Sequence, residues 1–217
     1  MTYVPMVDLT RMQKYWLVTG SIAPRPIALV TSCTAGGFCN AAPYSSFTYM
    51  GEEPPLMIIG VDRYGEESHR PGQMKDTQSN IAERGEFVVN MVDEILLERT
   101  VLCGTDFPAE VSEPEAVGFK LAPSTTVGVP RIAEAPISWE CRLFKIIDDF
   151  SKIRSIIIGE IVGMFFRDDI LDERTLRVRV DTYAPYGRLG GPNYCKTTER
   201  RRLGVPTFKA SKGVPLV

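Results

Sequence analysis

The run Pro26-Ile-Ala-Leu-Val-Thr-Ser32 is followed by the turn Thr34-Ala-Gly-Gly37, and the chain becomes apolar again at Phe38. A short run rich in aliphatic and β-branched residues is typical of a strand, and adjacent glycines are a strong turn signal. We therefore expect a strand, a turn and a return of the chain. Farther along, segments 55–61 and 86–92 have the same character and predict two more strands.

Segments with a period of two indicate the kind of sheet. In 137–143 and in 176–180, apolar residues alternate with polar ones, as in strands with one buried face and one wet face. Segment 153–166 is long and apolar on both faces, which predicts a strand across the centre of the sheet. Gly159 and Gly163 are expected to mark bends or bulges in it.

Short helices are expected between the strands. Asp76 or Thr77 is expected to cap a helix that runs to about residue 84, a second helix covers 94–102, and a third begins at Ser112. These helices do not alternate regularly with the strands. The pattern therefore favours a mainly β fold, a closed antiparallel barrel with short peripheral helices, over a doubly wound sheet.

Length and charge bound the remaining possibilities. The 217 residues suit a single domain, 1–217, which ends in a basic, Gly- and Pro-containing tail from residue 197 that is expected to be an extended arm or a partly disordered terminus. The formal charge of -2 leaves no basic field for nucleic acid. No apolar run is long enough to span a membrane, and the start of the chain lacks the layout of a signal peptide. We expect a soluble, cytoplasmic protein.

The cysteines and the histidine argue against metal and disulfide chemistry. The five cysteines are scattered and odd in number, and a single histidine, His69, excludes the usual zinc clusters. Cys33 and Cys39 flank the first turn and are close enough in sequence to meet. In a reducing compartment, however, a disulfide between them is not expected, and no metal site is expected.

Four runs are candidates for a binding site. Each also has an ordinary structural explanation, as the start of a strand, a polar connection, a helix cap or close packing at glycine. The runs are Ser21-Ile-Ala-Pro-Arg-Pro-Ile-Ala-Leu-Val-Thr-Ser32; Asn40-Ala-Ala-Pro-Tyr-Ser-Ser-Phe47 followed by Glu53-Pro-Pro-Leu56; Lys75-Asp-Thr-Gln-Ser-Asn-Ile81 closing on Gly85-Glu-Phe-Val-Val-Asn90; and Tyr186-Gly-Arg-Leu-Gly-Gly-Pro-Asn-Tyr194.

The first two runs are suited to a flat, polar-rimmed ligand. Pro24 and Pro26 remove two backbone donors and hold the chain extended around Arg25, so that bare backbone can face a heteroaromatic ring. In 41–46, small residues permit close approach, and the serine hydroxyls can bond phosphate or ribityl oxygens.

The third run is suited to an anion. Lys75 precedes a predicted helix N-terminus, where backbone amides and the helix dipole favour negative charge, and the hydroxyl of Thr77 lies beside it. Asp76 would repel a phosphate unless its carboxylate turns outward, and helix capping alone also explains Asp76 and Thr77. Arg63, after the predicted strand 55–61, is a further candidate partner for a phosphate or pyrophosphate.

In this order and spacing, the four runs resemble the flavin reductase-like domain family, an FMN-binding split barrel of antiparallel Greek-key type, and most closely its flavoredoxin-type branch. The resemblance covers about residues 15–195. It implies FMN rather than FAD as the cofactor, NAD(P)H as the electron donor, and a homodimer with the flavin near the subunit contact. Residues of the fourth run are implied to lie near the flavin or that contact.

The resemblance also implies a set of cofactor-binding residues. These are Arg25, Pro26, Ile27 and Ala28 at the ring; Asn40, Ala41, Ala42, Pro43, Tyr44, Ser45, Ser46 and Phe47 along the ribityl chain and phosphate; Arg63, Lys75, Asp76 and Thr77 near the phosphate; and Arg188 and Tyr194 in the last run. Hydride transfer between stacked rings needs no protein acid, base or nucleophile, so no catalytic residue is expected. Three roles stay open: a reductase that passes electrons onward, an FMN electron carrier for a redox protein partner, and a barrel without redox turnover.

Overall fold

The predicted strand and turn at residues 26–38 belong to a hairpin of two strands, β2 (Ala28–Cys33) and β3 (Cys39–Tyr44). They pair antiparallel, with Ala28 opposite Tyr44 and Cys33 opposite Cys39. The computed structural model describes residues 1–108 and 110–204. Every residue of β2 is buried, because the strand also pairs with β6 (Glu86–Met91) on its other side.

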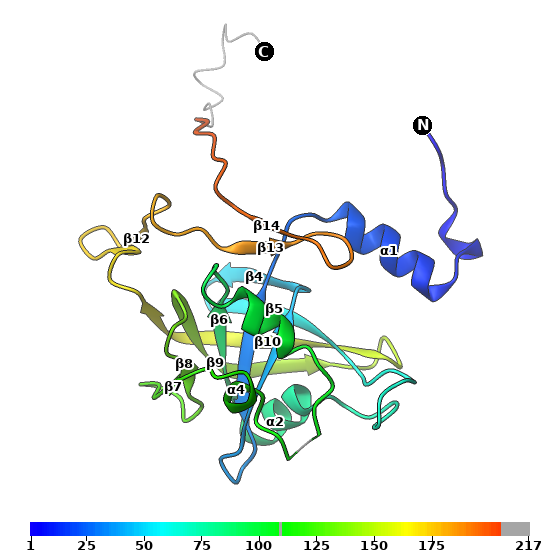
Figure 1. The fold of residues 1–217 in the computed structure, drawn as a ribbon, viewed down its shortest axis with the longest axis horizontal. Coiled ribbons are helices and arrows are strands. Elements are labelled where there is room, and N and C mark those ends of the chain that lie inside the picture. Colours follow the sequence, from blue (N-terminus) through cyan, green and yellow to red (C-terminus); the bar gives the residue numbers. More distant parts are fainter. Residues whose placement is uncertain (109, 205–217) are drawn as a thin grey trace, which may run out of the picture.

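A seven-stranded antiparallel sheet forms the body of the molecule (Figure 1), in the order β3-β2-β6-β9-β10-β5-β4. Its remaining strands are β4 (Phe47–Glu52), β5 (Pro55–Asp62), β9 (Ile137–Ile147) and β10 (Arg154–Phe166). The consecutive strands β3 and β4 are at opposite ends of this order, and the chain crosses from β5 to β6 past β10 and β9. The predicted mainly β, antiparallel Greek-key architecture is confirmed.

The largest core cluster fills the interior of the curved sheet. Phe87, Met57 and Ile157 are fully buried members of it. A Cβ atom at Gly159 would overlap the ring of Phe87, so β10 needs glycine where it passes this ring. The β9–β10 register shifts on the N-terminal side of Gly159 and again before Gly163, which confirms the predicted irregularities.

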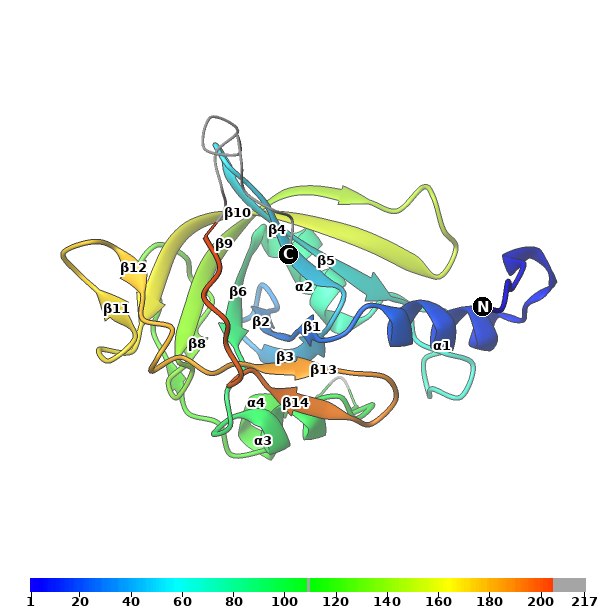
Figure 2. The same ribbon diagram turned by 90° about the horizontal axis from the view of Figure 1, so that it is seen from above.

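Smaller sheets flank the barrel. A three-stranded sheet has the order β1-β13-β14, with β1 (Arg25–Pro26), β13 (Tyr186–Arg188) and β14 (Tyr194–Lys196), and it lies beside the β2–β3 end of the barrel (Figure 2). Two-stranded ribbons are formed by β7 (Leu121–Ala122) with β8 (Arg131–Ile132) and by β11 (Leu171–Asp172) with β12 (Arg177–Val178).

The strand predicted over 176–180 is wrong in extent and in burial. Only Arg177–Val178 is a strand, in the β11–β12 ribbon outside the main sheet. The apolar members of the alternation are exposed, with Leu176 at 77% and Val180 at 59%. Leu176 also adopts a positive φ of 53°, which ends an extended run. Alternation of apolar and polar residues predicts that one face of a strand is buried. Here no part of the described chain covers the apolar face.

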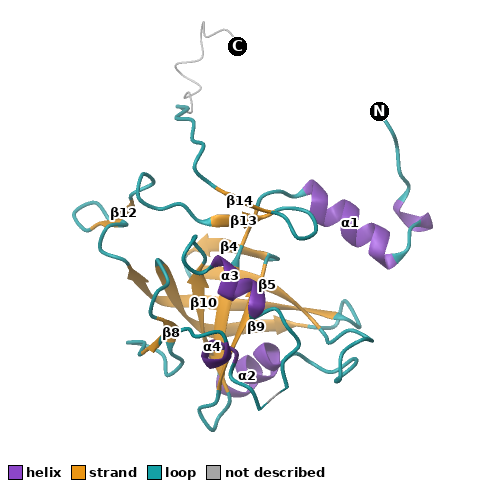
Figure 3. Cartoon of the chain, viewed as in Figure 1, coloured by secondary structure: helices purple, strands orange, loops and turns teal. Residues whose placement is uncertain are grey.

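The helices lie at the periphery of the strands (Figure 3). They are a short 3-10 turn at Met6–Asp8, α1 (Arg11–Ser21), α2 (Asp76–Arg84), α3 (Leu97–Leu102) and α4 (Glu113–Ala116). The sequence did not predict α1, which a capping box between Thr10 and Gln13 begins. No residue of α1 is buried, and the helix projects from the barrel (Figure 2).

Two details of the predicted helices need correction. Neither Asp76 nor Thr77 caps α2, since Lys75 is the N-cap residue and no side chain caps the helix. The carboxylate of Asp76 is bound to Arg70 instead, at 2.7 Å. The second helix begins at Leu97 rather than at residue 94, whereas α4 begins after Ser112 as predicted.

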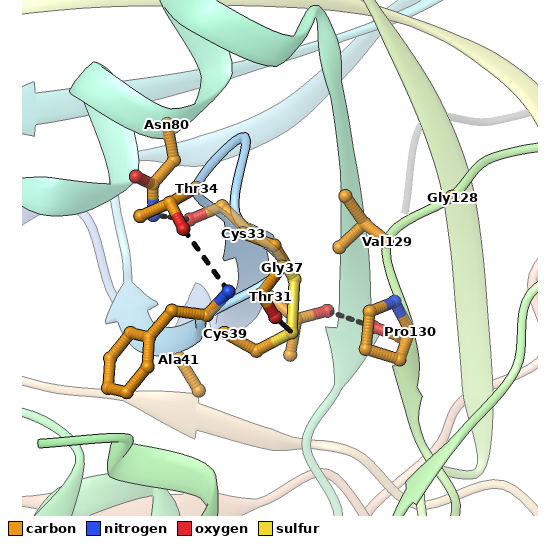
Figure 4. Close-up of a disulfide and its surroundings, with 12 residues drawn as sticks. Thr31, Cys33, Thr34, Gly37, Cys39, Ala41, Asn80, Gly128, Val129 and Pro130 are labelled. Carbon is orange, nitrogen blue, oxygen red and sulfur yellow. Dashed lines mark hydrogen bonds between the residues drawn. A yellow bond between two sulfur atoms is a disulfide. The ribbon is translucent and has the colours of Figure 1, made fainter.

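The expectation of free thiols at the first turn is wrong. Cys33 and Cys39 are joined by a disulfide, with their Cα atoms 4.1 Å apart (Figure 4). They are direct cross-strand partners at the end of the hairpin, and the shorter Cα separation of a non-hydrogen-bonded antiparallel pair suits such a bridge. The prediction was based on a reducing cellular compartment. The strand register instead places the two cysteines opposite each other, which allows the bond to form.

The C-terminal tail is described as far as residue 204. There Thr197 donates its backbone N–H to the carbonyl of Pro185 at 3.2 Å, and the rest of this stretch has no helix or strand. The predicted arm at 205–217 lies outside the described residues. Over the ranges that the structure covers, no helix has the length and apolar character needed to cross a bilayer.

Candidate functional site

A cavity of about 650 Å³ opens where β3, β5, the start of α2 and the α3–α4 connection meet. Its volume is within the range of small-molecule binding sites. Nine of the predicted site residues line it: Asn40, Ala42, Pro43, Tyr44, Arg63, Lys75, Asp76, Thr77 and Arg188. The structure thus brings together residues of the second, third and fourth sequence runs.

One part of the cavity wall carries two cations without acidic partners. Lys75 precedes α2, and its Nζ lies 5.5 Å from the centre of the Tyr64 ring. Arg63 donates from Nη1 to the carbonyl of Gly72 at 3.4 Å. Neither side chain is within 4.0 Å of a carboxylate in the described ranges. Lys75 at the N-terminus of α2 and Arg63 on the same cavity wall are suited to a phosphate.

Asp76 does not oppose this charge, because its carboxylate is already paired. Arg70 donates to both of its oxygens, at 2.7 and 2.8 Å, and the hydroxyl of Tyr64 donates to Oδ2 at 2.9 Å. Burial, and then the hydrogen bond to Asp76, raise the pKa of Tyr64 above its ordinary value, so the phenol keeps its proton. The negative charge of Asp76 is therefore offset by Arg70, although Asp76 itself lines the cavity.

Glu113, the first residue of α4, is a cavity-lining residue that the sequence did not identify as a site residue. Its side chain is buried, at 8% exposure, and Oε2 accepts from the backbone N–H of Ala41 at 3.3 Å. With its amide nitrogen facing Glu113, Asn40 donates to both carboxylate oxygens, at 2.6 and 2.7 Å. The carbonyl oxygen of Asn40 then accepts from the hydroxyl of Thr77 at 2.9 Å. Glu113 therefore orients two predicted site residues.

Burial raises the pKa of Glu113 to about 7, and the N–H of Ala41 opposes this rise. The group therefore titrates near neutral pH, at the floor of the cavity. Its only local signal was the acidic first turn of a predicted helix. Its partners are 72 and 73 residues away in the chain, so no local pattern reports them.

Tyr44 provides an unused polar group. Its hydroxyl is buried and has no hydrogen-bond partner in the described part of the chain. The ring lines the main cavity and also a smaller one of about 180 Å³. A buried hydroxyl without a partner is unfavourable, so a polar ligand atom would stabilise it. Together with the two free cations and the small Ala42, it makes the cavity a good fit to a flavin nucleotide.

The smaller cavity, which we call the annex, shares Pro43, Tyr44, Gly104 and Arg188 with the main cavity. It brings in three further predicted residues, Ile27, Ser45 and Tyr194. Val101 and Thr100 of α3 complete its wall. The annex therefore adjoins the main cavity, and Arg188 and Tyr44 line both.

Six predicted residues are not placed on these two cavities. Arg25 and Pro26 line a third cavity of about 200 Å³ beside β13. Ala28 and Ala41 are fully buried, and Phe47 packs in the core with its ring 5.6 Å from that of Trp139. Ser46 lines none of the three cavities.

The described residues also contain no group of three or more histidine, cysteine or acidic side chains arranged to hold a metal ion.

A family model, the flavin reductase like domain, matches residues 20–185. The chain belongs to this flavin reductase-like family. The match includes both sides of the main cavity, from Asn40 to Glu113, and almost the whole barrel, so the predicted family membership is confirmed.

Solved structures of known proteins agree. The chain is 63% identical to the 2-nitrobenzoate 2-nitroreductase of Pseudomonas fluorescens, over 98% of this chain and 100% of that one, with a TM-score of 0.87. It is 33% identical to nitrilotriacetate monooxygenase component B of Bacillus cereus, over 94% and 98% of the two chains, with a TM-score of 0.86. A putative flavin reductase of Shewanella frigidimarina with a split-barrel domain, 18% identical over 92% and 96% with a TM-score of 0.78, shares the fold, as flavoredoxins do. The predicted split barrel is confirmed.

Proposed function

We propose that this flavin reductase-like protein binds FMN in the main cavity and works as an NAD(P)H-dependent flavin oxidoreductase. The observation that carries the proposal is that two cations without acidic partners, Lys75 at the start of α2 and Arg63 after β5, line one cavity of ligand size. When bound, the flavin supplies the chemistry, since it can accept a hydride from a nicotinamide nucleotide and pass electrons onward.

The chain's own residues bind and orient. Lys75 and Arg63 hold the phosphate by charge, and the hydroxyl of Tyr44 donates to a polar atom of the ligand. Asn40 and Thr77 are held in place by Glu113. Ala42 and Pro43 form a wall without long side chains, which permits a flat ring to approach the backbone. No side chain is assigned an acid, base or nucleophile role, because the transfer itself does not need one.

Anaerobic mixing with NADH or NADPH tests this function. Loss of the visible flavin absorbance on mixing with either nucleotide supports the reductase. Loss of absorbance only with a reduced protein donor would instead support the second role, an FMN electron carrier for a redox protein partner. A protein that binds neither FMN nor FAD would refute both, and parallel titrations with the two flavins test the preference for FMN.

Substitution of Lys75 tests the phosphate clamp directly. A hydrogen bond to a charged group contributes about 1.5–3 kcal/mol, so Lys75→Ala is expected to weaken FMN binding by about 10- to 100-fold. Fluorescence quenching of FMN measures the affinity. Lys152→Ala, at an exposed lysine between β9 and β10, is the matched control. Unchanged FMN affinity in Lys75→Ala would contradict the clamp.

The acceptor and the assembly are further parts of the proposal. The 63% identity to a 2-nitrobenzoate 2-nitroreductase over both whole chains supports a nitroaromatic acid as the acceptor of the electrons. We further propose that the protein works as a homodimer. The apolar side chains exposed on helix α1 support the dimer.

A further inference from the structure

We propose that Arg188 is the carboxylate-binding residue for a small aromatic acid held in the annex. This inference deepens the proposed function, since it names the group that recognises the acceptor, and it rests on that function for the role of the bound acid. It depends on the charges around Arg188, on the donors that Arg188 leaves unused, and on the size and lining of the annex.

Two arginines face each other beside the annex, and one of them, Arg188, lines it. Arg25 of β1 and Arg188 of β13 are direct cross-strand partners, so their side chains leave the same face of the small sheet. Like charges in directly opposite positions are destabilising. Neither guanidinium is within 4.0 Å of a carboxylate of the described residues, so the pair has no acidic counter-charge there.

Arg25 has already used four of its five N–H donors on the protein. It is only 8% exposed, and it donates to the carbonyls of Thr19, Ile22 and Leu189 and to the hydroxyl of Ser45. All of these acceptors are uncharged, so they satisfy its N–H groups without neutralising its charge. Burial and the charge of Arg188 both lower the pKa of Arg25, which is the effect expected where positive charge is uncompensated.

Arg188 is the member of the pair that is free to bind. Its Nε is buried and has no hydrogen-bond partner among the described residues. Its guanidinium lies 5.8 Å from the centre of the Tyr194 ring and lines both the main cavity and the annex. A guanidinium presents a planar fork of donors that matches a carboxylate. An anion bound to Arg188 would satisfy the free Nε and also supply the missing counter-charge.

The annex selects the rest of the ligand. Its volume of about 180 Å³ is well below that of the main cavity, so it suits a small molecule beside a larger one. Ile27, Pro43 and Val101 give it apolar walls, and Tyr44 and Tyr194 add aromatic surface. Apolar and aromatic walls with one cation fit a planar ring that carries a single carboxylate.

Calorimetric titration of the FMN-saturated protein with benzoate tests the inference, with benzamide as the uncharged analogue. We expect saturable benzoate binding and much weaker benzamide binding. In Arg188→Gln, benzoate affinity is expected to fall about 10- to 100-fold, as for a lost hydrogen bond to a charged group. Arg177→Gln, at an exposed arginine of β12, is the control and should bind benzoate as the parent does.

Three outcomes of the benzoate titrations would overturn the inference. They are the absence of benzoate binding in the parent, equal benzoate affinity in the parent and Arg188→Gln, and displacement of benzoate by inorganic phosphate at equal concentration. A loss of FMN affinity in Arg188→Gln that equals or exceeds its loss of benzoate affinity would also overturn it, because Arg188 would then be a flavin ligand. Benzoate binding does not depend on nicotinamide, so a protein that binds benzoate but is not bleached by NAD(P)H refutes the proposed function alone.

Discussion

The carboxyl group of Glu113 has an unusual position for a charged side chain. It is buried beneath the cavity, where its partners are the amide of Asn40 and the backbone of Ala41. Burying a carboxylate without a cation is costly, and the pKa responds by rising to about 7. The folded protein therefore retains a proton at this site between about pH 4.5 and 7, where the unfolded chain has released it.

Stability should depend on pH through this group. Because the folded state binds more protons in that window, the free energy of unfolding falls as pH rises from about 4.5 to about 7. Relative to Glu113→Gln, which cannot titrate, the parent is expected to lose on the order of 2–3 kcal/mol between pH 5 and pH 8. Urea unfolding at the two pH values measures this difference.

Glu115→Gln is the control for Glu113→Gln, since Glu115 is exposed in the same short helix. Its pH dependence should match that of the parent. If Glu113→Gln also shows the parent's pH dependence, Glu113 does not titrate as described.

Lys75 and Glu113 show what single residues reveal before the fold is known. Lys75 was predicted as an anion ligand because its neighbours in the chain, the start of a helix and a hydroxyl, supply the reasons locally. Glu113 was missed because its role comes from Asn40 and Ala41, which meet it only after the barrel has formed. Local chemistry can be read from sequence, whereas a buried pairing between distant segments cannot.

The β2–β3 hairpin carries both the Cys33–Cys39 disulfide and residues that line the main cavity. The disulfide closes its turn end, and Asn40, the next residue after Cys39, lines the main cavity. The hydrogen bonds of Asn80 to Ser32 and of Thr31 to Pro130 hold the same end of β2 to α2 and to the 128–130 segment (Figure 4). The start of the ligand-binding strand is therefore fixed on several sides.

Breaking this disulfide should reduce stability moderately. The bridge closes a short loop, with a sequence separation of 6, and loop entropy then gives about 2 kcal/mol. Cys33→Ala combined with Cys39→Ala is expected to lower the free energy of unfolding by about this amount, measured by urea titration. Dithiothreitol should destabilise the parent similarly and leave the double variant unchanged. Equal stability of oxidised and reduced parent protein, with reduction verified by mass, would contradict this expectation.

Elements were predictable where pattern and environment agree. The segments that became β2, β5, β6, β9 and β10 were all expected as strands, and each is in the seven-stranded sheet. Segment 176–180 had the same alternation but lies outside this sheet. Helix α1 was missed, and its apolar residues are exposed rather than buried against the barrel. Periodicity predicts which face of a segment is apolar. Whether another element packs against that face depends on the rest of the structure.

In the whole molecule, helix α1 is the element whose apolar side chains are not covered by the barrel. Met12, Tyr15, Trp16 and Val18 are all exposed on it, with Trp16 at 62%. Exposed apolar patches of this kind mark interaction surfaces. In the proposed homodimer, a second copy of the chain covers these apolar side chains, so α1 is a subunit contact.

The dimer can be tested by mass in solution. Light scattering after size exclusion is expected to give twice the chain mass of 24.2 kDa for the parent at micromolar concentration. Trp16→Asp combined with Val18→Asp places two charges in the apolar surface and should shift the protein to monomer. Lys152→Glu, on the exposed β9–β10 turn, should remain dimeric. A monomeric parent would contradict the proposal.

The fold and about half of the candidate site were within reach of the sequence. The four runs identified the family because their order and spacing hold over most of the chain, and nine of their residues line the main cavity. The annex was not expected, although Ile27, Ser45 and Tyr194 on its wall had been predicted as ligands of a single site. Division of one group of residues between two chambers depends on side-chain packing, which no run of sequence describes.

The contacts of Arg25 connect the proposed dimer contact at α1 with the affinity of the annex for its ligand. Its one guanidinium is bonded to the carbonyls of Thr19 and Ile22 at the end of α1, to the carbonyl of Leu189 after β13, and to Ser45 on the annex wall. A partner that holds α1 and a ligand that occupies the annex thus act on the same side chain. Thermodynamic coupling between two such events is reciprocal. The factor by which dimerisation changes ligand affinity is therefore the factor by which the ligand changes dimer affinity, and ligand affinity should depend on protein concentration.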